Sequence, residues 1–119
     1  MAWSVVLAEE VADWFLALAA GDQATAAQVQ AAIDVLAEYG PGLGRPLVDR
    51  IKGSTIHNMK ELRPGSSGAS EVRVLFVFDP DRQAVLLVAG DKAGNWQGWY
   101  RKAIPTAERR YQRWIREKR

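Results

Sequence analysis

The sequence contains no cysteine and a single histidine, His57. A chain without cysteine forms no disulfide and offers no thiolate ligand, and one imidazole cannot build a histidine cluster. These absences argue against a zinc site and against Ser–His–Asp or Cys–His catalysis. We therefore expect no metal and no cofactor. A protein that needs no oxidising compartment also fits the cytoplasm.

Long apolar runs are missing as well. No segment approaches the roughly 18 consecutive apolar residues that a membrane-spanning helix requires. Residues 1–4 place no basic region ahead of the first apolar residues, unlike a secretory signal. We expect no membrane partner and a cytoplasmic protein. The 119 residues match the size of one domain, residues 1–119, with room for a real core.

Positive charge is absent from the first part of the chain. Residues 1–44 contain six acidic residues and no Lys or Arg, whereas residues 45–119 contain all 16 basic residues and the other eight acids. The net charge of +2 conceals this division. The basic part favours a nucleic-acid or phosphate partner, while the acidic part reads as a solvated helical face. Charge alone does not identify the partner.

Hydrophobic periodicity predicts an α+β domain. The expected elements are a strand at 3–7, helices at 9–20 and 23–39, an irregular connector at 42–54, strands at 55–63, 71–78 and 84–89, and a helix at 105–118. The short break between the first two helices predicts an antiparallel hairpin. Turn residues between the three later strands predict an antiparallel meander. Pro105 suits the first position of the last helix.

Basic side chains are expected to meet on this meander. Arg63 ends its first strand and Arg73 begins the second, so a hairpin would bring them together, and Lys92 follows the third strand. Taken alone, each arginine would more commonly form a surface ion pair, for example with Glu61 or Glu71. Three neighbouring cations repel one another, however, and persist most readily where an anion is bound. The pattern therefore predicts a phosphate site.

An aromatic side chain stands beside further cations. Tyr100 precedes Arg101 and Lys102, and its phenol can stack on a base or take part in proton transfer. Aromatic rings interleaved with basic residues suit single-stranded RNA, whose bases stack while its phosphates are neutralised. Trp96 and Trp99 either belong to the same surface or close one end of the core, and the sequence leaves both readings open.

These features occur with others in a characteristic order. The series comprises the run His57–Arg63, Arg73-Val74-Leu75-Phe76 with Phe78-Asp79-Pro80 and Arg82, Gly90-Asp91-Lys92, Tyr100, and then Ile104, Ala107 and Tyr111. In this combination nearly the whole chain resembles the HigB-type toxins of the RelE/ParE superfamily. The resemblance implies a RelE-like fold and the toxin of a type II toxin–antitoxin system. Such toxins cut messenger RNA without a metal, usually in the ribosomal A site, by attack of the 2′-hydroxyl on the adjacent phosphate.

The resemblance also implies roles for individual residues. Arg63 and Arg73 would clamp the scissile phosphate, Lys92 matches the basic residue after the last strand of the meander, and Tyr100 would stack on a base or assist proton transfer. Some relatives use a glutamate as the base, which adds Glu61 to the catalytic candidates. The remaining expected RNA-binding residues are Lys60, Arg45, Lys52, Arg101 and Lys102.

Two features depart from the family pattern. The turn at 64–70 is long, which leaves the geometry of Arg63 and Arg73 less fixed. The last helix is unusually basic, so it would contact ribosomal RNA or be neutralised by an acidic antitoxin.

The leading interpretation is a ribosome-dependent messenger RNA endoribonuclease that inhibits translation and growth. Its expected partners are a cognate antitoxin of the helix-turn-helix type, the ribosome and messenger RNA, with DNA contacted only through the antitoxin. Two alternatives remain open: a nucleic-acid-binding module of the same fold that cuts nothing, and a ParE-like inhibitor of DNA gyrase. Clusters of Arg and Lys do not separate cutting from holding, because both require phosphate neutralisation.

Overall fold

The computed structural model describes residues 2–65 and 70–118. Its elements follow the chain as β1 Ser4–Leu7, α1 Glu9–Gly21, α2 Gln23–Tyr39, the 3-10 turn η1 Gly40–Gly42, β2 Val48–Arg50, β3 Lys60–Leu62, β4 Val72–Phe78, β5 Gln83–Asp91 and α3 Trp96–Lys118. The turn expected at 64–70 includes residues 66–69, which lie outside the described residues.

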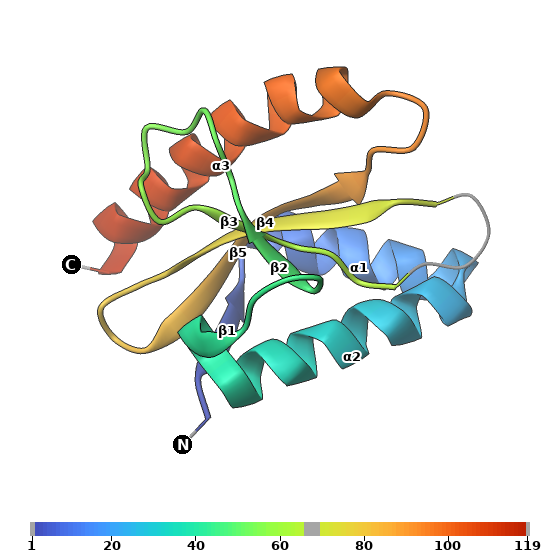
Figure 1. The fold of residues 1–119 in the computed structure, drawn as a ribbon, viewed down its shortest axis with the longest axis horizontal. Helices are drawn as coiled ribbons and strands as arrows, with labels where there is room; N and C mark the ends of the chain where they lie inside the picture. Colours follow the sequence, from blue (N-terminus) through green and yellow to red (C-terminus); the bar gives the residue numbers. More distant parts are fainter. Residues whose placement is uncertain (1, 66–69, 119) are drawn as a thin grey trace.

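The five strands form one mixed sheet in the order β1-β5-β4-β3-β2. Strand β1 runs parallel to β5, and each of the other neighbouring pairs is antiparallel. Helices α1 and α2 cover one face of the sheet and α3 covers the other (Figure 1). The expected α+β class, the N-terminal strand and the meander β3–β4–β5 are confirmed. Every helix in the described ranges is too short or too polar to cross a bilayer.

The hairpin of α1 and α2 is also confirmed, and its turn has a simple chemical cause. Only Asp22 separates the two helices. The Asp22 carboxylate caps α2, because it accepts hydrogen bonds from the backbone N–H of Thr25 at 3.1 Å and from the Thr25 hydroxyl at 2.7 Å. A side-chain acceptor at this position satisfies a backbone donor that the helix itself leaves unpaired.

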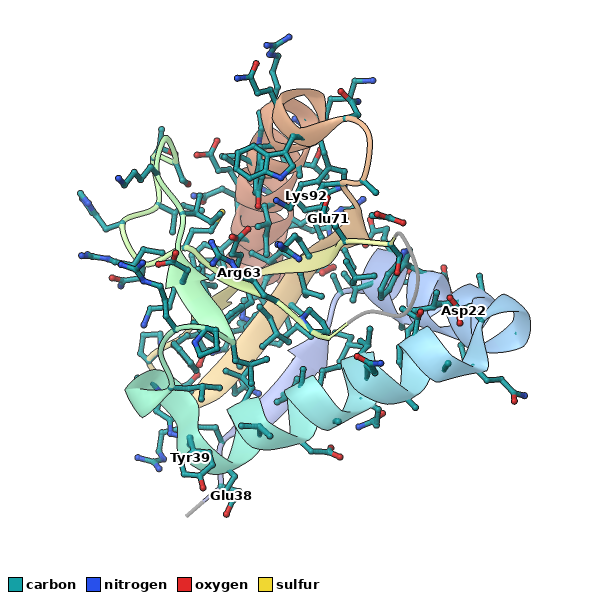
Figure 2. All side chains as sticks on the ribbon, turned by 45° about the vertical axis from the view of Figure 1, so that its right-hand side comes forward. Asp22, Glu38, Tyr39, Arg63, Glu71 and Lys92 are labelled. Atoms are coloured by element: carbon teal, nitrogen blue, oxygen red, sulfur yellow. The ribbon has the colours of Figure 1, made fainter. Side chains whose placement is uncertain are left out.

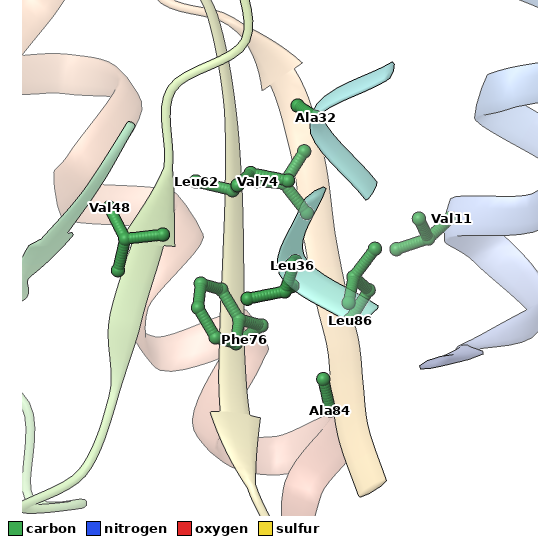
Figure 3. Packing of buried hydrophobic residues seen from close by; sticks show 9 residues of the cluster. All are labelled: Val11, Ala32, Leu36, Val48, Leu62, Val74, Phe76, Ala84 and Leu86. Carbon is green, nitrogen blue, oxygen red and sulfur yellow. The ribbon is translucent and has the colours of Figure 1, made fainter. Parts of the chain in front are cut away.

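Helices on both faces require apolar side chains on both faces of the central strands. In β4, Val74 and Phe76 point towards α1 and α2, whereas Leu75 and Val77 point towards α3. Figure 3 shows the cluster on the first of these faces, which consists of Val11, Ala32, Leu36, Val48, Leu62, Val74, Phe76, Ala84 and Leu86. The period-two alternation of a strand thus builds two cores from one run of hydrophobic residues.

A β-bulge in β5 changes which side chains face α3. Leu75 of β4 pairs with Val88, but the next residue, Phe76, pairs with Leu86, so Leu87 is an extra residue in β5. Leu87 and Val88 consequently both belong to the core under α3. Beyond the bulge the alternation is shifted by one residue, which turns Gly90 towards α3. The shift aims the chain that follows β5 at the same face.

Two expectations about the region before β4 are wrong. The connector at 42–54 contains strand β2, which pairs with β3, and the strand expected at 55–63 is reduced to the three residues of β3. Glu108 of α3 accepts hydrogen bonds from the Ser54 hydroxyl at 2.8 Å and from the backbone N–H of Thr55 at 2.6 Å. These donors are satisfied by a helix, so they join no strand ladder.

Helix α3 begins at Trp96, and the expected start at Pro105 is wrong. The backbone N–H of Asn95 donates to the Lys92 carbonyl at 3.1 Å, and the N–H of Trp99 donates to the Asn95 carbonyl at 2.9 Å. These bonds turn the chain into a helix directly after β5. Pro105 lies inside the helix, where it removes one N–H donor from 23 residues. The early start matters because it makes the Tyr100 region helical.

Candidate nucleic-acid interface and active site

The five residues predicted to be catalytic come together at one end of the sheet, on the face covered by α3. They come from four places in the chain, namely β3 and the residue after it, β4, the residue after β5, and the N-terminal part of α3. In this order they are Glu61, Arg63, Arg73, Lys92 and Tyr100. Alternation explains the first three, because they lie on the same face as Leu75 and Val77 of the α3 core.

Glu61 is the centre of this group. It is only 3% exposed, and both of its carboxylate oxygens accept hydrogen bonds. Oε1 accepts from Nε of Arg63 at 2.8 Å, and Oε2 accepts from the Tyr100 hydroxyl at 2.5 Å. Arg63 also donates through Nη2 to Asp49 at 3.0 Å. A buried carboxylate is tolerated here because each of its oxygens accepts a hydrogen bond and it faces positive charge.

The Tyr100 phenol stays protonated in this environment. Burial and then the hydrogen bond and negative charge of Glu61 raise the pKa of Tyr100 above its ordinary value of 10.0. The nearby guanidinium of Arg73 opposes this effect only in part. The ring makes edge contacts with Trp96 and Trp99, at centroid distances of 6.0 and 5.0 Å. In the free protein the Tyr100 hydroxyl therefore keeps its proton and donates it in the hydrogen bond to Glu61.

Arg73 is incompletely satisfied. Its Nη1 donates to the Val72 carbonyl at 2.8 Å, but its buried Nε has no hydrogen-bond partner in the described chain. The β3–β4 register, which pairs Leu62 with Val74, places Arg63 next to Arg73 when it is continued by one residue. A buried donor without an acceptor is unfavourable by about 1–3 kcal/mol. The unpaired Nε therefore predicts an acceptor that comes from outside the described chain.

Lys92 is a second cation that forms no ion pair in the described chain. Its side chain is buried, with 2% exposure, and its ammonium makes no ion pair within the described residues. The ammonium lies 3.8 Å from the ring centroid of Trp96 and 5.6 Å from that of Tyr100. Burial and the charge of Arg73 lower the pKa of Lys92 below 10.5, and nearby carboxylates, including Glu71, offset this only in part. Figure 2 shows Lys92 and Glu71 at the same end of the sheet.

The five predicted RNA-binding residues do not all join this site. Arg101 and Lys102 follow Tyr100 in α3 and are exposed. Arg45 and Lys52 are exposed on the segments on either side of β2, and Nε of Arg45 lies 3.7 Å from Asp49. Lys60 lies on the opposite face of the sheet, where its ammonium sits 5.4 Å from the Phe78 ring centroid.

Sequence reasoning missed one member of the site and left another undecided. Asp49, which binds Arg63, lies in β2, a strand that was not expected because its pairing with β3 is non-local. Trp96 belongs to the surface of the site, since its ring covers Lys92 and is 58% exposed. Trp99 instead packs against Gly90. In residues 2–65 and 70–118, no three His, Asp or Glu side chains are close enough to hold a metal ion.

The other end of α3 is organised differently. Arg113 donates through both Nη atoms to the Glu10 carboxylate, each at 2.8 Å, and Arg110 approaches the same carboxylate at 3.5 Å. Lys118 pairs with Asp79 at 2.9 Å and also contacts Asp81. The basic character of the last helix is thus partly neutralised by the chain's own carboxylates.

Comparison with known proteins gives concordant results. The family model described as phage derived protein Gp49-like matches residues 13–112. Two Mycobacterium tuberculosis proteins are similar in sequence. “Putative toxin HigB3” is 50% identical over 94% of this chain and 93% of its own length, and “Putative toxin HigB2” is 55% identical over 84% of this chain but only 48% of its own length.

One solved structure is similar in fold. It is a mutant of the E. coli toxin RelE in the free state, with a TM-score of 0.62 and 13% sequence identity, over 88% of this chain and 97% of that one. At this level of identity the likeness concerns the fold alone.

Proposed function

This chain belongs to the phage-derived Gp49-like family and to the HigB-type toxins of the RelE/ParE superfamily, and from that premise we propose that it is an endoribonuclease that cuts messenger RNA. The observation that carries the proposal is a pair of cations, Arg73 and Lys92, that form no ion pair in the described chain and lie beside the Glu61–Tyr100 hydrogen bond. A scissile phosphate supplies an anion that pairs with both cations. A protein that inhibits gyrase through protein contacts needs no such arrangement.

The proposed reaction is attack of a ribose 2′-hydroxyl on the adjacent phosphate, with departure of the 5′-oxygen. Negative charge builds on the phosphate oxygens in the transition state, and donors already fixed in position stabilise it. Arg73 and Lys92 provide this stabilisation. Arg63 contributes positive charge but is also held by Glu61 and Asp49, so it fixes the carboxylate as well as the phosphate.

Two proton transfers accompany the attack. Glu61 accepts the proton of the 2′-hydroxyl, since a carboxylate oxygen that already accepts one hydrogen bond retains a second lone pair. Lys92 donates a proton to the leaving 5′-oxygen, and its lowered pKa makes it a better acid than an ordinary lysine. Tyr100 remains protonated and holds Glu61 in place. One proton enters the protein and one leaves it in each cleavage.

Exposed basic residues support the ribosome as the place of action. Arg101, Lys102, Arg109 and Arg116 are exposed on α3 and form no ion pair in the described chain. Such residues attract RNA phosphates and release counterions on binding. A ribosome-bound toxin would act in the cytoplasm. We further propose a cognate antitoxin of the helix-turn-helix type, partly acidic, which covers these cations and alone contacts DNA.

Induction of the chain without an antitoxin tests the proposal. Growth is expected to stop, and new RNA 5′ ends should map inside translated reading frames. Purified protein should cut a message on ribosomes but leave the same RNA intact without them. Arg73→Ala should relieve the arrest, whereas Tyr39→Ala, which changes an exposed residue at the far end of α2, should not (Figure 2). Arrest with intact transcripts and altered DNA supercoiling would contradict the proposal and favour the gyrase alternative.

A further inference from the structure

The indole ring of Trp96 covers the Lys92 ammonium. The ammonium lies 3.8 Å from the ring centroid, and Lys92 is 2% exposed while Trp96 is 58% exposed. Tyr100 closes another side of the ammonium at 5.6 Å. The ring therefore shields the cation from solvent, and a phosphate that is to contact Lys92 directly must first displace it.

The Trp96 side chain is more exposed and less closely packed than that of Trp99, so its ring has room to move. Trp96 is the first residue of α3 and follows Gly94, which has a φ of +77°, and Asn95, which is exposed. In the described chain its ring contacts the Lys92 ammonium and the ring of Tyr100. Trp99 shows the contrast. Its indole packs so closely on Gly90 that an added Cβ would lie 2.6 Å from Nε1.

An exposed aromatic ring beside unpaired cations suits single-stranded RNA. Base–aromatic stacking and neutralisation of phosphates by neighbouring basic residues act together in such sites. The ring of Trp96 attracts Lys92 through its π face, and the same face can stack on a nucleobase. A nucleotide can thus offer the ring a base and the ammonium a phosphate at the same time. Lys92 exchanges the ring for a phosphate and Trp96 exchanges the ammonium for a base, so that each side chain keeps an interaction.

We propose that Trp96 is a displaceable cover for Lys92, and that binding of single-stranded RNA transfers its ring from the ammonium to the base next to the scissile phosphate. Base recognition would then uncover the cation that stabilises the reaction. Trp96 acts as a positioning residue. The inference rests on the proposed function in one respect, the contact between Lys92 and the phosphate, and both of its tests are independent of RNA cleavage.

The first test measures the accessibility of Lys92 in the free protein. The folded chain is treated with an amine-reactive reagent, and labelling of Lys92 relative to exposed Lys102 is followed by mass spectrometry. Trp96→Ala should increase relative labelling of Lys92 by roughly tenfold or more, whereas Trp96→Phe, which keeps an aromatic face, and the remote Tyr39→Ala should leave it near the parental value. Equal protection of Lys92 in Trp96→Ala and the parent would overturn the covering role.

The second test measures the binding of two probes that cannot be cut. One is a short single-stranded 2′-O-methyl oligonucleotide, and the other has the same backbone without bases. Trp96→Ala should bind the first about 10-fold to 100-fold more weakly, the loss of one stack, and Trp96→Phe should recover most of this. Binding of the abasic probe should be unchanged or stronger, because Lys92 is open.

The outcomes separate the two proposals. Equal losses of affinity for both probes, or no binding of the base-containing probe by the parent, would overturn the transfer of the ring to a base. Absence of RNA cleavage together with the expected labelling and binding would overturn the nuclease proposal alone.

Discussion

Cations lie near both ends of α3, but in the described chain ion pairs that join α3 to α1 and to the β4–β5 turn form only near its C-terminus. Towards the C-terminus, Arg113 makes two hydrogen bonds of 2.8 Å to Glu10, and Lys118 binds the carboxylates of the β4–β5 turn. Towards the N-terminus, Lys92 is buried without an ion pair and Arg73 keeps a buried donor without an acceptor in the described chain. Near its C-terminus α3 thus carries several paired cations, whereas Lys92 and Arg73 near its N-terminus have no ion pair in the described chain.

This contrast distinguishes charges that stabilise the fold from charges that are available to bind a ligand. Ion pairs such as Arg113–Glu10 tie α3 to α1 across the edge of the sheet and need no further partner. Unpaired buried cations destabilise the free protein, so their presence is consistent with a function that requires them. The buried Glu61 offsets part of this unfavourable charge, and it is itself hydrogen bonded to Arg63 and Tyr100.

The largest expected effect on stability comes from removing the Glu61 carboxylate. Glu61→Ala leaves Nε of Arg63 and the Tyr100 hydroxyl without the acceptor that they share, and Arg63 keeps its ion pair with Asp49. We expect the free energy of unfolding to fall by about 3 kcal/mol, the lower end for a broken buried pair because Arg63 is partly exposed. Urea denaturation followed by circular dichroism measures this. Asp49→Ala, which removes a more exposed partner of Arg63, should lower stability by less than about 1 kcal/mol. Equal effects of the two variants would contradict the central role of Glu61.

A smaller effect, of the opposite sign on stability, is expected at Lys92. Lys92→Met preserves a long side chain under Trp96 but removes the buried charge. RNA cleavage should slow by on the order of a hundredfold, about 2.7 kcal/mol, while the free energy of unfolding rises by about 1 kcal/mol. Single-turnover cleavage and urea denaturation of the same preparation give both values. A loss of stability would show that the fold depends on the ammonium, and the contrast between the two ends of α3 would fail.

The smallest effect is expected at the paired end and depends on pH. The hydrogen bond from Arg113 and the backbone of Glu10 lower the pKa of the Glu10 carboxyl from 4.5 to about 2. Because the folded pKa is below the ordinary value, this contribution to stability is complete above pH 4.5 and is lost as the pH falls towards 2. Arg113→Ala should therefore lower the free energy of unfolding by about 0.5–1 kcal/mol at neutral pH and by almost nothing near pH 2. A difference that does not change with pH would assign the effect to lost packing instead.

Much of the fold could be predicted because its signals are local. The alternation of Val72–Phe78 and the helical spacing of the first two helices are properties of short segments, and the structure confirms them. The proximity of Arg63 and Arg73 follows from an antiparallel hairpin. The same alternation places Lys60 and Glu61 on opposite faces of β3, so the separation of Lys60 from the site was accessible to sequence reasoning.

The remaining features depend on contacts between distant segments. Strand β2 exists because it pairs with β3, and its three residues carry no strong signal of their own. The extra residue Leu87 lies in an apolar run in which either face is plausible, yet it shifts the alternation that leads to Lys92. The start of α3 was misjudged because Pro105 suits a helix N-terminus, whereas the actual start depends on the Lys92–Asn95 turn. The Glu61–Tyr100 hydrogen bond depends on both the extra residue in β5 and the early start of α3.

Single-turnover cleavage of a ribosome-bound message by Arg73→Ala and Arg113→Ala tests the central claim most directly. Each variant removes one arginine, Arg73 near the N-terminus of α3 or Arg113 near its C-terminus. At saturating protein, Arg73→Ala should cut on the order of a hundred to a thousand times more slowly, about 2.7–4 kcal/mol, with its stability and ribosome binding retained. Arg113→Ala should cut at the parental rate although it unfolds at lower urea. Cleavage by Arg73→Ala at the parental rate under saturation would show that the unpaired cation only helps binding, and the claim would be contradicted.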